Sequence, residues 1–173
     1  MLSLFLLPLL AQDSPVAGLA MTDLIETLPA CTPKTSAAPT LDLQKSCVAG
    51  ACEGMSIQQL TEALGEPTCE GGKDTVTQGS TFCDWPGGIS GHYREGETGP
   101  GSLFVEDPAH RSPEGYGVGS SLACFIQDYG DGASSVEVRV LDGRLYITSL
   151  RLKEPHISVS AGLDGVVTKI QLN

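Results

Sequence analysis

The chain has few aromatic side chains, few basic side chains and no long apolar run. Aromatic residues make up 5% of its 173 residues, so large stacking surfaces are scarce. Lysine and arginine together number 10 against 21 aspartates and glutamates, and the formal net charge is −11. Nucleic acid and anionic membrane surfaces repel so acidic a chain. The sequence therefore predicts no nucleic-acid partner.

The apolar stretch at residues 2–11 is too short to span a bilayer, which needs about 20 residues, so no transmembrane segment is expected. It fits the apolar region of a secretory signal peptide, although no Lys or Arg precedes it. We expect a signal peptide at 1–20, with cleavage after Ala11 or Ala20. A buried N-terminal helix is the alternative. The expected location is therefore secreted or periplasmic.

Six cysteines agree with export, because an even number beside a signal-like start is typical of disulfides. They are Cys31, Cys47, Cys52, Cys69, Cys83 and Cys124. No CxxC occurs, which disfavours thioredoxin-type and zinc-ribbon readings. The favoured pair is Cys69–Cys83, which would clamp a glycine-rich polar loop of about 15 residues and contribute about 3 kcal/mol. Cys47 and Cys52 could bridge each other, or one could reach Cys31. Cys124 is either a buried thiol or an anchor for the N-terminal arm.

Residues 21–50 are rich in Pro, Ala and Thr and show weak helix periodicity, so we expect an arm or linker there. A clear helix follows. Ser56 can cap it and Gln59 completes a capping box. Gly65 is placed to end the helix, and Pro67 prevents its continuation.

A second segment repeats these features 65 residues later, with Ser121 as the cap and Gly130 as the stop. Any two capped helices would share a serine start and a glycine end. The equal spacing of caps, stops and apolar positions favours an internal repeat. Candidate strands follow each helix, at 80–85, 91–95 and 102–106 and then at 136–141, 144–152, 156–160 and 166–172.

The sequence therefore predicts an α+β fold of two tandem helix-plus-antiparallel-meander repeats, at 51–115 and 116–173. One short helix cannot cover such a sheet, so the repeats should form one sheet with both helices on one face. The opposite face would be exposed, and it is the expected binding surface.

Signals for catalysis or metal binding are missing from the sequence. His92, His110 and His156 have no partner at metal-ligand spacing, and no GxSxG elbow or phosphate loop is present. The segment at 128–132, "DYGDG", lacks the alternating ligands and closing Glu of a calcium loop. We therefore expect no catalytic, cofactor-binding or metal-binding residues, and a protein that is not an enzyme.

Residues 54–85 combine Gly54, Met55 and Ser56, a helix that ends at a glycine, and the two cysteines Cys69 and Cys83. This segment resembles the repeat unit of the beta-lactamase inhibitory protein family. More loosely, it is similar to the small outer-membrane lipoproteins of the barrel-assembly machinery. The resemblance implies the tandem fold and export. It also implies, for the inhibitor family, a concave sheet face that binds an enzyme.

These observations predict an exported, non-catalytic protein-binding module, with enzyme inhibition as one use of the exposed sheet face. The expected partner is a protein that carries a basic surface patch. Candidate anchors are Trp85, His92, Tyr93 and Tyr146, because large aromatic side chains often carry interface energy. For each anchor, ordinary core or sheet packing is the alternative. A structural or assembly protein of the cell envelope and a small secreted hydrolase are the other functions that the sequence allows.

Overall fold

The computed structural model describes residues 26, 28–34, 38–71, 79–94, 96–129, 133–141, 144–152 and 157–173, with only the backbone at 138–141 and 144–149. The predicted signal peptide, the helix stop at Gly130 and His156 lie outside these residues. No helix among the described residues is long and apolar enough to cross a membrane.

Two antiparallel sheets and two helices make up the described fold, in agreement with the predicted α+β class. The eight-stranded sheet has the order β4-β5-β6-β7-β11-β10-β9-β8. Its strands are β4 (Thr68–Gly71), β5 (Ser80–Trp85), β6 (Ile89–Arg94), β7 (Leu103–Val105), β8 (Ala133–Leu141), β9 (Arg144–Leu152), β10 (Ile157–Ala161) and β11 (Val167–Leu172). The three-stranded sheet consists of β1 (Leu41–Asp42), β2 (Cys47–Val48) and β3 (Ala51–Cys52). The helices are α2 (Ile57–Leu64) and α3 (Leu122–Tyr129).

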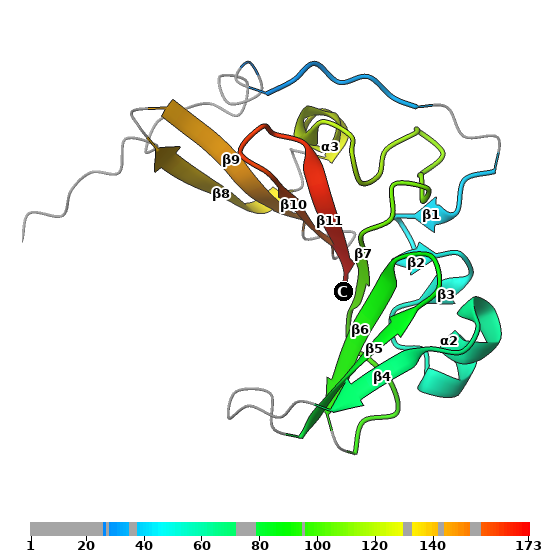
Figure 1. Cartoon of the computed structure of the whole chain (residues 1–173). Coiled ribbons are helices and arrows are strands. Elements are labelled where there is room, and N and C mark those ends of the chain that lie inside the picture. Colours follow the sequence, from blue (N-terminus) through cyan, green and yellow to red (C-terminus); the bar gives the residue numbers. More distant parts are fainter. Residues whose placement is uncertain are drawn as a thin grey trace, which may run out of the picture.

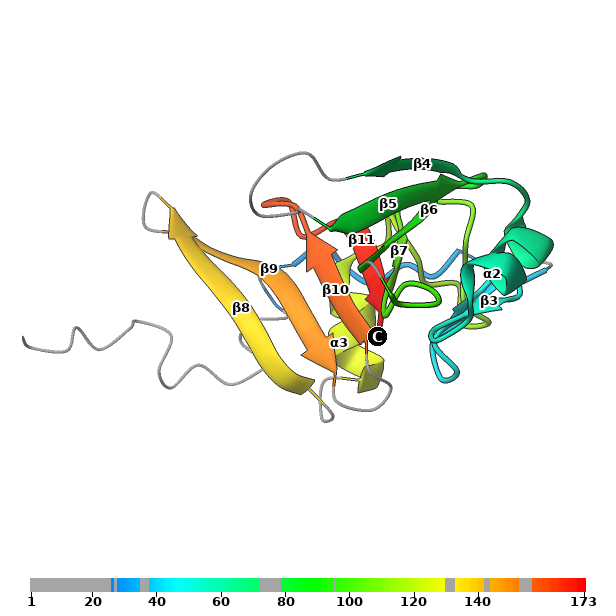
Figure 2. The same cartoon turned by 90° about the horizontal axis from the view of Figure 1, so that it is seen from below.

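Each helix is followed by four strands that pair in chain order, and the last strands of the two sets meet. Strand β7 pairs with β11, so that Val105 lies opposite Ile170 and Leu103 opposite Leu172. The two halves of the sheet diverge from this junction (Figure 1). Figure 2 shows α3 beside the half that holds β9 and β10, and α2 beside β3.

Local capping explains where helix α2 begins and ends. The Ser56 side chain accepts a hydrogen bond from the Gln59 backbone, and the Gln59 side chain accepts one from the Ser56 backbone. Gly65 ends the helix with φ of 95°, a conformation in which a residue with a Cβ is strained. The predicted capping box and glycine stop are confirmed. Helix α3 also has eight residues, and the Ser121 hydroxyl accepts a hydrogen bond from Ala123 N at its start.

Buried and more exposed positions alternate in several strands, and the buried ones pack with residues of both helices in one core cluster. In β5, Cys83 and Trp85 are buried while Phe82 and Asp84 are exposed. The buried strand residues share one cluster with Leu60 of α2 and with α3. The other strand members of this cluster include Ile89, Leu103, Val105, Leu150, Leu152, Ile157, Val159, Val167, Ile170 and Leu172. In β5, β6 and β7 this alternation places the remaining side chains on the opposite side of the sheet, which we call the open face.

The segment that the sequence predicts as an arm or linker has two different parts. Its last residues form β1 and β2 of the three-stranded sheet, whose third strand β3 lies just beyond it, and Leu41 and Val48 are buried in the core. Two-residue strands between tight turns are too short to show a periodicity, which is why the pattern does not reveal them. The earlier part, 28–34, lies on the domain. There Lys34 N donates to the Gly115 carbonyl, and the Ser121 hydroxyl donates to the Pro29 carbonyl.

Candidate functional site

The open face of the eight-stranded sheet carries a line of rings that we call the aromatic row. It consists of Phe82 on β5, His92 on β6 and Phe104 on β7. The Phe82 and His92 rings stack at 5.6 Å between centroids with an interplanar angle of 25°. The His92 and Phe104 rings stack at 6.1 Å and 19°. The row therefore crosses three adjacent strands.

Sheet register explains why these rings meet. Phe82 lies directly opposite His92 in the β5–β6 pair, and Ser90, two residues before His92, lies opposite Phe104. Directly opposed and diagonal side chains on one face are close enough for rings to touch. Phe82 is 43% exposed, and among the described side chains only one other large apolar residue, Leu163, is exposed. The row therefore presents an apolar edge to water at a fixed position.

Charged and polar side chains of β11 lie next to the aromatic row. The Lys169 ammonium lies 5.4 Å from the centroid of the Phe104 ring and 2.6 Å from a carboxylate oxygen of Glu106. The Gln171 amide donates to the Ser102 hydroxyl at 3.3 Å. Such polar contacts around an apolar centre are the usual composition of a protein-binding surface.

The four predicted anchors lie in different places. His92 is on the open face, within the aromatic row. Trp85 is 3% exposed and belongs to the core, because it shares its side of β5 with Cys83. Tyr93 is half-buried and packs against the core. Tyr146 is in β9 opposite Arg139, where the structure describes only the backbone. The structure thus does not gather these four residues on one surface.

Phe82 and Phe104 are the surface residues that the sequence prediction lacks. The favoured disulfide already held a signal for Phe82. Cys83 on β5 must point to the same side of the sheet as its partner Cys69. The neighbouring Phe82 then has to face the other way. The strand pattern alone does not say which of these two faces meets the core.

The six cysteines form three disulfides, Cys31–Cys124, Cys47–Cys52 and Cys69–Cys83. The last is the pair that the sequence favours, and its cysteines lie directly opposite each other on β4 and β5. The first fastens the arm to α3. The second closes the β2–β3 hairpin, again between directly opposed positions.

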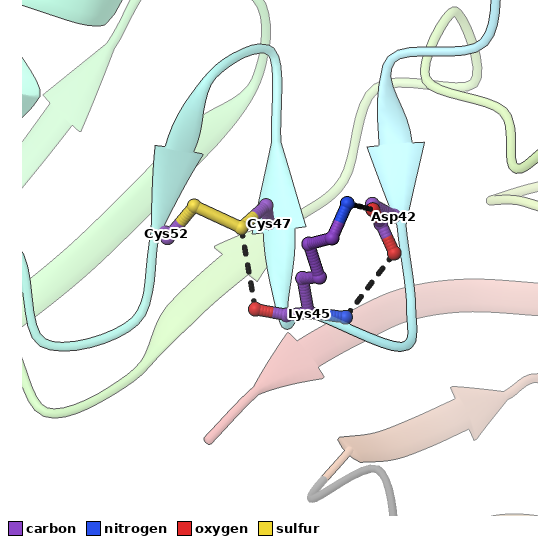
Figure 3. Close-up of polar contacts among 4 residues, drawn as sticks. All are labelled: Asp42, Lys45, Cys47 and Cys52. Carbon is purple, nitrogen blue, oxygen red and sulfur yellow. Dashed lines mark hydrogen bonds and ion pairs between the residues drawn. A yellow bond between two sulfur atoms is a disulfide. The ribbon is translucent and has the colours of Figure 1, made fainter.

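An open groove of about 690 Å³ lies over the three-stranded sheet. It is lined by Pro39, Thr40, Leu41, Asp42, Lys45, Cys47, Ala49, Gly50, Cys52 and Pro113. Asp42 accepts a hydrogen bond from Lys45 N at 3.1 Å, and its carboxylate lies 3.0 Å from the Lys45 ammonium (Figure 3). These contacts with Lys45 lower the pKa of Asp42. The disulfide Cys47–Cys52 stands beside this ion pair (Figure 3).

Two other titratable side chains, His110 and Tyr116, have structural partners. Both ring nitrogens of the buried His110 are engaged, one with the Thr40 hydroxyl at 2.9 Å and one with the Gly87 carbonyl at 2.8 Å. The Tyr116 hydroxyl donates to Asp128 at 2.6 Å, and this bond, with burial, raises the pKa of Tyr116 to about 12. Within the described ranges, no three His, Cys, Asp or Glu side chains are grouped to hold a metal ion.

Comparison with protein-family models, curated proteins and solved structures gives no match for this chain.

Proposed function

We propose that this chain is an exported, non-catalytic module that binds a protein partner through the open face of its sheet, with inhibition of an exported enzyme as one use. The observation that supports this proposal most is the aromatic row. The Phe82 side chain is 43% exposed, and a partner that covers it would gain free energy by removing its apolar surface from water. Aromatic anchors near the centre of a surface often provide most of the binding energy.

Pre-organisation is the second support. His92 stacks against a phenylalanine on each side, so the rings of the aromatic row lose little rotational freedom when a partner covers them. A surface that is already ordered loses less conformational entropy on association. The disulfides tie the arm to α3, close the β2–β3 hairpin and tie β4 to β5, which adds to this rigidity. Disulfides are typical of secreted and periplasmic proteins, which fits an exported module.

The layout of the fold also supports the proposed tandem repeats. Each eight-residue helix precedes four strands, and the two sets join through their last strands, β7 and β11. Such an arrangement suits two related units that share one sheet, with both helices on the core side. The proposed partner carries a basic patch, because the chain has a net charge of −11 and opposite charges steer association.

The test measures binding and inhibition against exported enzymes with a range of surface charge, beginning with beta-lactamases. The full chain is immobilised, and binding is followed by biolayer interferometry. Phe82→Ser should weaken binding about tenfold or more. Leu163→Ser is the matched control, because Leu163 is 51% exposed but lies in the turn between β10 and β11.

If the partner binds the Phe82→Ser variant and the unaltered chain with equal affinity, the proposed binding through the open face is wrong. The buried Trp85 supplies a fold control, because its fluorescence reports on the core on the opposite side of β5. A variant that loses affinity while the Trp85 emission is unchanged has lost a contact and has kept its fold.

A further inference from the structure

The three disulfides differ in what surrounds their sulfur atoms. Cys83 and Cys124 are each 0% exposed and belong to the core cluster. Their partners Cys69 and Cys31 are nearer to solvent. Cys47 and Cys52 are both partly exposed, and both line the groove over the three-stranded sheet.

This difference matters because thiol–disulfide exchange needs an accessible sulfur and a stable leaving thiolate. A thiolate that attacks Cys69 must expel the Cys83 sulfur as an anion into an apolar core. Apolar burial raises the pKa of a thiol and makes it a poorer leaving group. The same applies to attack at Cys31, which expels the Cys124 sulfur. Attack at Cys47 or Cys52 expels the other sulfur into the open groove, where water can solvate it.

We propose that Cys47–Cys52 is a thiol-exchange site that accepts electrons from low-molecular-weight thiols while the rest of the protein stays folded and oxidised. A thiolate attacks one sulfur, forms a mixed disulfide and releases the other cysteine as a thiolate, which takes a proton from water. A second thiolate attacks the small-molecule sulfur of the mixed disulfide and releases the second cysteine. The two small thiols leave as their disulfide, and the two electrons that they lose reduce the protein.

The fold keeps the reduced pair ready to close again. Cys47 and Cys52 lie opposite each other with their Cα atoms 4.0 Å apart. The next pair in the same ladder, Val48 and Ala51, is 0% exposed and anchored in the core. Core packing therefore holds the two strands together without the bridge, and the site can cycle between disulfide and dithiol.

The groove admits a thiol of modest size. Its apolar walls include Pro39, Leu41 and Pro113, and its volume is about 690 Å³. Lys45 projects beside Cys47, where its positive charge favours a thiolate and the carboxylates of a peptide-like thiol (Figure 3). Asp42 shares that charge, at 3.0 Å from the ammonium.

The experiment treats the oxidised full chain with reduced glutathione at neutral pH without denaturant. Samples taken over time are quenched with acid and then transferred to denaturant with excess N-ethylmaleimide at neutral pH, so that buried and exposed free thiols are alkylated alike. They are then digested and analysed by mass spectrometry. Free thiols at Cys47 and Cys52 should appear at least about tenfold faster during the glutathione treatment than free thiols at the other four cysteines. Trp85 fluorescence and the elution volume on gel filtration should be unchanged. Oxidised glutathione should then restore the bridge.

Two outcomes would overturn the proposal. One is labelling of Cys69 and Cys83 at the same rate as Cys47 and Cys52, or earlier. The other is a chain whose bridges all resist glutathione until denaturant is added. A variant with Cys47→Ser and Cys52→Ser should lose the fast phase, and a matched variant with Cys69→Ser and Cys83→Ser should keep it. Because the rates are measured on the unaltered chain, the test stands even if a variant does not fold.

Discussion

Removing the disulfide between the arm and helix α3 should cost this protein more stability than removing either of the other two. Cys31 and Cys124 are 93 residues apart in sequence, whereas the other pairs are 14 and 5 residues apart. A crosslink limits the unfolded chain, and the entropy that it removes grows with the logarithm of the loop length. The perturbation is a double substitution, Cys31→Ala with Cys124→Ala.

The loop-closure relation gives about 4.7 kcal/mol for the longest loop, about 3 kcal/mol for the 14-residue separation and about 2 kcal/mol for the shortest. The total stability of a domain is about 5–15 kcal/mol, so the first value is a large fraction of it. For a chain of this size the first variant should melt about 10–20 °C lower than the unaltered protein. The arm would then be held mainly by the hydrogen bonds of Lys34 and Ser121.

Urea unfolding of the three double variants, followed by Trp85 fluorescence and far-UV circular dichroism, measures these losses. The slope of free energy against urea concentration shows whether the unfolded states differ in exposed surface. The expected order of destabilisation is Cys31–Cys124, then Cys69–Cys83, then Cys47–Cys52. A larger loss for the Cys69–Cys83 variant than for the Cys31–Cys124 variant would refute the loop-length reasoning.

Two further substitutions test single contacts. The folded-state pKa of Tyr116 is about 12, above its unfolded value of 10.0, so its stabilising contribution is present below pH 10 and is lost as pH rises to 12. Tyr116→Phe should therefore cost about 1 kcal/mol at neutral pH, through the lost bond to Asp128, and should reduce the fall in stability between pH 10 and 12 in urea titrations. An unchanged fall would disprove this assignment. A Cβ at Gly165, which has φ of 73°, would lie 2.6 Å from Leu28 Cδ2, so Gly165→Ala should cost about 1–3 kcal/mol in thermal melts. Gly101→Ala, with open space at its Cβ, is the control and should be nearly neutral.

The sequence alone was enough where neighbouring residues decide the structure. Helix α2 begins at Ser56 and ends at Gly65 because capping and a left-handed turn depend on residues within one helical turn. Strands β5 and β9 have the predicted bounds, 80–85 and 144–152, because alternation and turn residues are local patterns. The favoured pairing of Cys69 with Cys83 follows from the short loop between them.

Only the tertiary structure decided which side of each strand faces the core. The alternation in β5 separates Phe82 from Trp85, but it does not say which of them faces the core. Long-range packing buries Trp85 and leaves Phe82 beside His92 on the open face. The same packing joins β7 to β11 and brings Cys31 to Cys124, contacts between segments far apart in the chain. Such contacts depend on the summed burial of the whole core, which no short stretch of sequence contains.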